Sequence, residues 1–143
     1  MLSKEDCIVE LEGLLPRFAK SFQTGSRLSL ADLNITIPQL HVLMQLSHND
    51  NCKTSDLSKA LNVTLPNITA MIDRLIKEGF VARAADKLDR RIVRIKLSKK
   101  GQKLIANHTK HRRVKLSTML EKMNAGEIKA MFDIMKKVIS QTS

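Results

Sequence analysis

The sequence predicts a mainly α-helical protein with one small β-hairpin. Apolar residues recur at helical spacing through most of the 143 residues, and 43% of the chain is apolar, which is enough for a core. Residues 92–97 instead alternate between two faces, as in a half-buried strand. The length fits one domain, or one domain with an appended assembly element.

Six helices are expected in order along the chain. The first, over residues 3–23, contains Pro16, and we expect a kink or a break there because an interior proline costs ~3 kcal/mol or more. Residues 25–34 are expected to form a loop or an irregular short helix. The other helices are predicted over 36–48, 54–61, 64–78, 98–123 and 124–141. Side chains that can cap a helix stand at Thr36, Thr64, Ser98 and Asn124.

The third and fourth of these helices form a helix-turn-helix pattern. Asn62 and Val63 make the short turn between them. The first of the two is expected to bury Leu57, Ala60 and Leu61. The second has an apolar face made of Leu65, Ile68, Met71, Ile72, Leu75 and Ile76.

Two short strands are predicted after the helix-turn-helix, over residues 80–84 and 92–97. Residues 85–91 between them are polar and charged, as expected of a projecting hairpin tip. A helix-turn-helix followed by a two-stranded hairpin is a winged helix. Gly79 ends the preceding helix, at a position where glycine is favoured.

Positive charge is concentrated in the same region. The chain carries +11 overall, and residues 53–122 hold eighteen basic against six acidic side chains. Such an excess points to a polyanionic partner, either nucleic acid or an anionic membrane surface. Since the basic residues gather on the helix-turn-helix and the hairpin, and not along one amphipathic helix, nucleic acid is favoured.

Other classes of protein find little support in the sequence. No run approaches the ~18 apolar residues of a membrane-spanning helix, and the first residues lack the apolar segment of a signal peptide. Two cysteines suit a reducing compartment, so we expect a cytoplasmic protein. No phosphate-binding glycine loop, nucleophile constellation or metal-hydrolase motif is present, so we expect neither an enzyme nor a cofactor.

The hairpin residues Arg83-Ala-Ala-Asp-Lys-Leu-Asp-Arg-Arg91, followed by Leu97-Ser-Lys-Lys-Gly101, carry a resemblance to a known family. With Leu75 to Val81 and Pro38 to Leu43 before them, they resemble the multiple-antibiotic-resistance regulator (MarR) family of bacterial winged-helix proteins, over roughly residues 36–105. The resemblance implies a homodimeric transcriptional regulator of double-stranded DNA with a pseudo-palindromic operator. We expect a repressor that a small-molecule effector releases.

The resemblance also implies which residues contact DNA. The helix over 64–78 would enter the major groove, and the wing over 85–91 would meet the minor groove. Asp89 would pair with Arg91 and orient its guanidinium, while Asn67 could pair bidentately with adenine. Many members carry a longer polar residue where this chain has Ala70, which offers only a methyl contact. The candidate DNA-binding residues are Thr64, Pro66, Asn67, Thr69, Ala70, Arg74, Lys87, Asp89, Arg90 and Arg91.

The two ends of the chain are expected to dimerise. Their apolar stripes have no room in a winged helix of ~70 residues, so mutual packing of two chains would cover them. We expect dimerisation helices within 1–35 and 105–143, and a DNA-binding lobe over 36–104. The candidate contact residues are Leu11, Phe18, Met131, Phe132, Met135 and Ile139.

The effector is poorly specified by the sequence. Cys7 is expected to be buried and unreactive, and Cys52 to be a turn residue. His41, His108 and His111 resemble the ligands of a zinc-responsive subgroup, although the surrounding basic stretch disfavours a dication. A metal-responsive regulator is therefore one alternative, and a winged helix that contacts protein or RNA is another.

Overall fold

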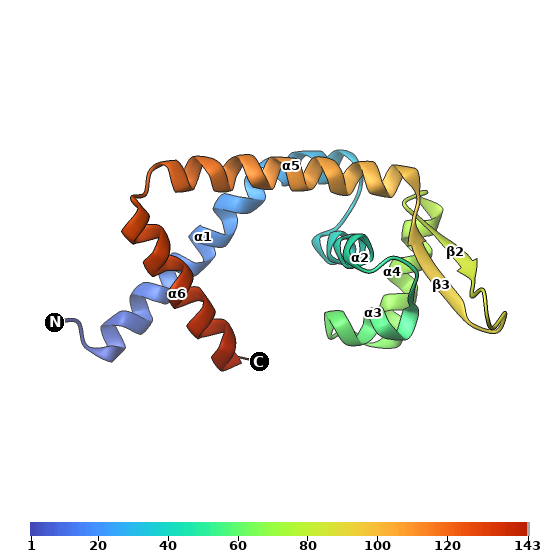
Figure 1. Cartoon of the computed structure of the whole chain (residues 1–143), viewed down its shortest axis with the longest axis horizontal. Coiled ribbons are helices and arrows are strands. Elements are labelled where there is room, and N and C mark those ends of the chain that lie inside the picture. Colours follow the sequence, from blue (N-terminus) through green and yellow to red (C-terminus); the bar gives the residue numbers. More distant parts are fainter. Residues whose placement is uncertain (143) are drawn as a thin grey trace.

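The computed structural model describes residues 1–142, and of these it leaves out the side chains of residues 23–29 and Ala31. A long helix, α5, runs along the molecule (Figure 1). Helix α6 and the first part of α1 lie toward one end, with both termini, the later part of α1 lies beside α5, and a lobe from α2 to β3 lies at the other end. The mainly helical class with a small sheet, predicted from the sequence, is confirmed. The elements are α1 (Lys4–Asp32), α2 (Ile37–His48), β1 (Cys52–Lys53), α3 (Thr54–Leu61), α4 (Leu65–Lys77), β2 (Val81–Ala85), β3 (Val93–Leu97), α5 (Lys99–Glu121) and α6 (Ala125–Thr142).

The sheet is antiparallel, with the strand order β1-β3-β2. The hairpin is paired from Val81 opposite Leu97 to Ala85 opposite Val93. The third strand, β1, pairs Lys53 with Arg94 and was not predicted, because two residues are too few to display a strand period. Both hairpin strands begin one residue later than expected, at Val81 and Val93.

The core lies in the lobe between α2 and β3, and α5 is fastened to it at its first turn. Ser98 donates its backbone N–H to the Phe80 carbonyl (3.0 Å) and its hydroxyl to the Gly79 carbonyl (2.6 Å). The Lys100 ammonium lies 4.4 Å from the centre of the Phe80 ring. The largest fully buried side chains are Leu43, Leu46, Leu57, Ile68, Ile72, Leu75, Phe80 and Ile95.

Most of the expected helix ends are confirmed. Thr36 and Gln39 form a reciprocal capping box, and so do Asn124 and Glu127. The Ser98 hydroxyl accepts the N–H of Gly101. Gly79 has φ +81°, the left-handed conformation that favours glycine after a helix. Thr64 stands at the N-cap of α4, but its side chain makes no capping hydrogen bond.

The expected loop or irregular short helix over 25–34 is wrong for residues 25–32, and so is the expected break at Pro16, since α1 continues to Asp32 as one helix with Pro16 inside it. Tertiary packing accounts for the extension: Leu30 at the end of α1 and Ile35 just after it are both buried in the lobe. The left-handed turn that ends the helix falls at Asn34, with φ 56°. Poor helix formers such as Thr24 and Gly25 therefore stay within the helix.

The expected burial of Ala60 and Leu65 is also wrong, and Val93, on the apolar face of the half-buried strand predicted over 92–97, is exposed. Ala60 is exposed although Leu57 beside it is fully buried, so α3 inserts only a narrow edge into the core. Leu65 is 50% exposed because it occupies the first turn of α4, beyond the reach of the core. Val93 is 46% exposed because the projecting end of the hairpin has nothing packed beneath that face.

Candidate nucleic-acid interface

Helix α4 presents one apolar and one polar face, as a recognition helix requires. Ile68, Ile72 and Leu75 are each at most 1% exposed and fix the helix against α2 and α3. The turn before it is tied by the Ser58 hydroxyl, which donates to the Val63 carbonyl (2.6 Å), and by Asn62 in a left-handed conformation, φ 52°. The orientation of α4 is therefore set by the core and by this turn.

The outward face of α4 contains the residues that the sequence singled out. All six are exposed: Thr64, Pro66, Asn67, Thr69, Ala70 and Arg74. The Thr69 hydroxyl donates back to the Leu65 carbonyl (2.8 Å), which leaves its oxygen available only as an acceptor. Ala70 and Arg74 also line a groove of about 380 Å³ against the start of α2.

An ion pair that sequence reasoning missed joins α4 to the hairpin. The Arg83 guanidinium on β2 lies 2.5 Å from the Asp73 carboxylate on the outward side of α4. Both side chains are about half exposed, so the pair contributes little stability. Its effect is to neutralise a carboxylate on a surface that is otherwise basic. The ten-residue separation gives no periodic signal from which it could have been predicted.

The wing presents the expected arginine. Asp89 Oδ1 accepts both the backbone N–H of Arg91 (3.0 Å) and its Nε (3.2 Å), and Oδ2 accepts Nη2 (3.3 Å). These bonds lower the pKa of Asp89, so the carboxylate is ionised at neutral pH. The Arg91 side chain is 91% exposed, and Lys87 and Arg90 are exposed beside it. A guanidinium held at its base and open at its tip can enter a narrow groove of negative potential.

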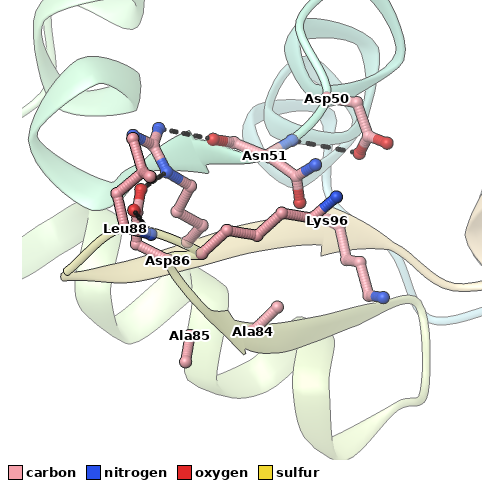
Figure 2. Close-up of a pocket in the computed structure, with 9 residues that line it drawn as sticks. Asp50, Asn51, Ala84, Ala85, Asp86, Leu88 and Lys96 are labelled. Carbon is pink, nitrogen blue, oxygen red and sulfur yellow. Dashed lines mark hydrogen bonds and ion pairs between the residues drawn. The ribbon is translucent and has the colours of Figure 1, made fainter. Parts of the chain in front are cut away.

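A second wing carboxylate, Asp86, was not among the predicted site residues. Its Oδ2 lies 2.5 Å from Arg94 Nε, and its Oδ1 accepts the N–H groups of Leu88 (2.8 Å) and Asp89 (3.1 Å). These partners, Arg94 first, lower its pKa to about 2. Asp86 and Asn51, both labelled in Figure 2, line an open groove of about 730 Å³. The Asp-x-x-Asp spacing at the hairpin tip was the signal that could have identified it.

The three candidate zinc ligands do not form a metal site. His41 and His108 line a cavity of about 180 Å³ where α1, α2 and α5 meet, together with Arg112. His111 is exposed, and among residues 1–142 no group of three His, Cys, Asp or Glu side chains could hold a metal ion. Burial, and then the charge of Arg112, lowers the pKa of His108, whose Nδ1 is buried without a hydrogen-bond partner. The zinc hypothesis is therefore not supported.

The two cysteines also differ from expectation. Cys7 is exposed, because no other element covers the first half of α1. Cys52 is buried within β1, where its thiol donates to the Asn49 carbonyl (2.7 Å) and burial raises its pKa. Cys52 is therefore a core residue and not only part of a turn.

The ends of the chain leave large apolar side chains uncovered. No residue of α6 is buried, and residues 1–21, with most of α1, are exposed throughout. Met131 is half-buried, whereas the other five candidate dimerisation residues are 46–60% exposed: Leu11, Phe18, Phe132, Met135 and Ile139. Among the described residues, no helix has both the length and the apolar content to cross a bilayer.

Comparison with known proteins places this arrangement in a family. A sequence model of the MarR family matches residues 35–93, from the end of α1 to the wing. The HTH-type transcriptional regulator YsmB of Bacillus subtilis is 30% identical over 126 residues, which cover 88% of this chain and 86% of that protein. The chain belongs to the MarR family.

Further matches agree with the MarR assignment. YfiV, another HTH-type transcriptional regulator of B. subtilis, is 33% identical over 71% of this chain, although the match spans only 63% of YfiV. A MarR family protein from Bacillus stearothermophilus has the same fold, with TM-score 0.80 and 28% identity over 99% of both chains. The structure of FabT from Streptococcus pneumoniae in complex with DNA superposes with TM-score 0.86 at 21% identity, which shows the shared fold (94% and 96% covered).

The MarR-family chain is thus a transcriptional regulator with a DNA-binding winged helix, and not an enzyme. The lobe from α2 to β3 is that winged helix. The predicted DNA-binding residues lie on its recognition helix and its wing, and all of them are exposed except Asp89, which is partly covered while it holds Arg91.

Proposed function

We propose that the protein is a homodimeric, cytoplasmic transcriptional repressor that binds a pseudo-palindromic operator. The observation that carries the proposal is the fixed, outward-facing pair Asp89–Arg91 on a wing that follows an exposed recognition helix. Each α4 would read base edges in the major groove through Asn67 and Ala70, with Thr64, Thr69 and Arg74 at the flanking phosphates. Each Arg91 would enter the adjacent minor groove.

Dimerisation is supported by the apolar faces of α1 and α6. Phe18, Phe132 and Met135, each about half exposed, would be unusually apolar for the surface of a monomer. A two-fold axis through residues 1–35 and 105–143 would cover them and set two DNA-binding lobes, 36–104, side by side. The operator would then contain two half-sites about one helical turn apart, ~34–36 Å centre to centre.

Release by a small effector is supported by the cavity between the lobe and the dimerisation helices. Its walls combine apolar side chains with His108 and Arg112, which suits a small, partly apolar molecule with a hydrogen-bonding or anionic group. Because α2 belongs to the lobe and α5 runs toward the expected dimer contact, occupation of the cavity would alter the spacing of the two recognition helices.

The test is to select DNA with the purified protein from sheared DNA of the source genome. We expect enrichment of a small set of fragments that share an inverted repeat with half-sites one turn apart. The proposal would be contradicted if no fragment were enriched, or if RNA added as a competitor were captured preferentially. Either result would favour the alternative of a winged helix that contacts protein or RNA. The enriched duplex then serves as the probe for the experiments below.

A further inference from the structure

The wing is thinly supported at the place where it projects from the lobe. Beyond the pair Lys53–Arg94, no third strand among the described residues lies beside the hairpin, and the tip over residues 86–92 extends from the final pair Ala85–Val93. An open groove, lined by Asp50, Asn51 and the hairpin strands, lies next to this root. A two-stranded hairpin alone is marginally stable, so something must fix the direction of the tip.

Arg94 bridges that groove. Its Nη1 donates to the Asn51 carbonyl in the turn after α2 (2.9 Å), while its Nε holds Asp86 Oδ2 (2.5 Å). Dashed lines in Figure 2 mark these two bonds, one at Asn51 and one at Asp86, whereas the other line at Asn51 joins it to Asp50. The Asp86 side chain is only 10% exposed, and that of Arg94 31%, so the pair is more shielded than the other ion pairs of the described residues.

Asp86 in turn fixes the backbone of the tip. Its second oxygen accepts two successive turn N–H groups, those of Leu88 and Asp89, and its own N–H donates to the Ile92 carbonyl (3.0 Å). Asp89 is the residue that orients Arg91. A continuous series of hydrogen bonds thus runs from Asn51 through Arg94, Asp86 and Asp89 to Arg91.

We infer that Asp86 and Arg94, braced on the Asn51 carbonyl, are positioning residues for the DNA-contacting Arg91. We call these three groups the wing anchor. This rests on the proposed minor-groove role of Arg91. Asp86 need not touch DNA, because its effect passes through the backbone of the tip and through Asp89.

The direction in which Asp86→Asn changes operator affinity distinguishes a positioning role of Asp86 from a purely electrostatic one. Asp86→Asn removes a negative charge from a surface that faces a polyanion, so Coulomb's law alone predicts tighter binding. The wing anchor predicts the opposite. If the released Arg91 spends about a fifth of its time in the productive orientation, the dissociation constant rises about fivefold.

The experiment measures operator affinity by anisotropy for the dimeric full-length protein. Asp86→Asn keeps the oxygen that caps the turn but disrupts the Arg94 pair, and we expect three- to tenfold weaker binding. The matched control, Asp50→Asn, removes the same charge beside the same groove. Among the described residues, Asp50 is bonded only to the N–H of Asn51, and we expect unchanged or slightly tighter binding. If Asp86→Asn lowers the melting temperature, Arg94→Lys replaces it, since lysine keeps the charge but cannot span both partners.

A double-mutant cycle with Arg91→Ala tests the route of the effect. Since Asp86 acts through Arg91, the double variant should bind no more than about twofold more weakly than Arg91→Ala alone. In hydroxyl-radical footprints of Asp86→Asn, the protection of the minor groove at the flanks of the operator should be lost. Protection of the major groove against dimethyl sulfate should persist.

Other outcomes separate the two proposals. The wing anchor would be overturned if the losses of affinity in Asp86→Asn and Arg91→Ala were additive. It would also be overturned if Asp86→Asn and Arg94→Lys both kept the parent affinity while Arg91→Ala bound weakly. Either result would leave the proposed function standing. Unchanged affinity for Arg91→Ala would overturn the minor-groove role and the wing anchor together.

Discussion

Gly101→Ala tests how α5 is joined to the DNA-binding lobe. A Cβ at this position would lie 2.2 Å from the Phe80 carbonyl oxygen and 3.1 Å from Leu97 Cδ2. Non-bonded contacts below 3.0 Å are essentially never seen for Cβ atoms, so α5 and the start of β2 must separate by about 0.8 Å. The atom in the way belongs to the backbone and cannot rotate aside.

The expected cost combines three effects. Overpacking of a buried site costs about 1–3 kcal/mol, and this contact belongs at the upper end. The hydrogen bond from the Ser98 N–H to the same Phe80 oxygen is strained as well, which costs about 1 kcal/mol of stability. The higher helix propensity of alanine stabilises the variant by about 1 kcal/mol. We therefore expect a net loss of about 2–3 kcal/mol.

Thermal unfolding followed by circular dichroism at fixed protein concentration measures this loss. At ~3 °C per kcal/mol for a chain of this length, the melting temperature should fall by about 6–9 °C. Gly126→Ala is the control: its Cβ meets only Asn124 Oδ1, a side-chain atom that can move, at 3.3 Å in the exposed first turn of α6, so the melting temperature should change far less than in Gly101→Ala. A melting temperature for Gly101→Ala at or above that of the parent would refute this reasoning.

Three further predictions concern DNA binding, assembly and acid stability. Arg91→Ala should weaken operator binding at least tenfold while sedimentation still reports a dimer, because the Arg91 side chain is 91% exposed and Asp89 is its only side-chain partner among the described residues; unchanged affinity, or loss of the dimer, would contradict its role. Phe132→Asp should produce monomers in sedimentation, since it places a charge in the apolar face of α6, and a stable dimer would count against that face as the interface. Asp86 has a pKa lowered from 3.8 to about 2, so its contribution to stability is present above pH 4 and is lost as the pH falls toward 2. Between pH 4 and pH 2, the urea midpoint of unfolding should therefore fall more steeply for the parent than for Asp86→Asn. If the two midpoints fall in parallel with pH, the ion pair of Asp86 with Arg94 is not formed in solution.

The sequence was informative where one local pattern decides the structure. The apolar periodicity of α4, the capping residues Thr36 and Asn124, and the glycine after α4 each predicted an element that the structure contains. The family resemblance carried by the Asp-Arg-Arg tripeptide implied the ion pair of Asp89 with Arg91, and the structure contains it.

Features that depend on distant partners were missed. Arg94 and Asn51 are 43 residues apart, and the extension of α1 depends on the burial of Leu30 in a lobe formed by later residues. His108 and His111 have suitable spacing for a metal, yet only His108 lines the cavity with His41, together with Arg112, whereas His111 is exposed. Spacing predicts which residues can meet on one helix, whereas tertiary packing decides which of them do.

The most direct test of the account is the affinity of the parent protein for its selected operator beside a scrambled duplex of equal length, across a salt series. We predict that the operator binds about 10³-fold more tightly near physiological salt. Both affinities should fall steeply with added salt, because the basic residues of 53–122 displace condensed counterions from the phosphates. Equal and weak binding to both duplexes would contradict the account, since the winged helix would then bind a partner other than a specific double-stranded DNA sequence.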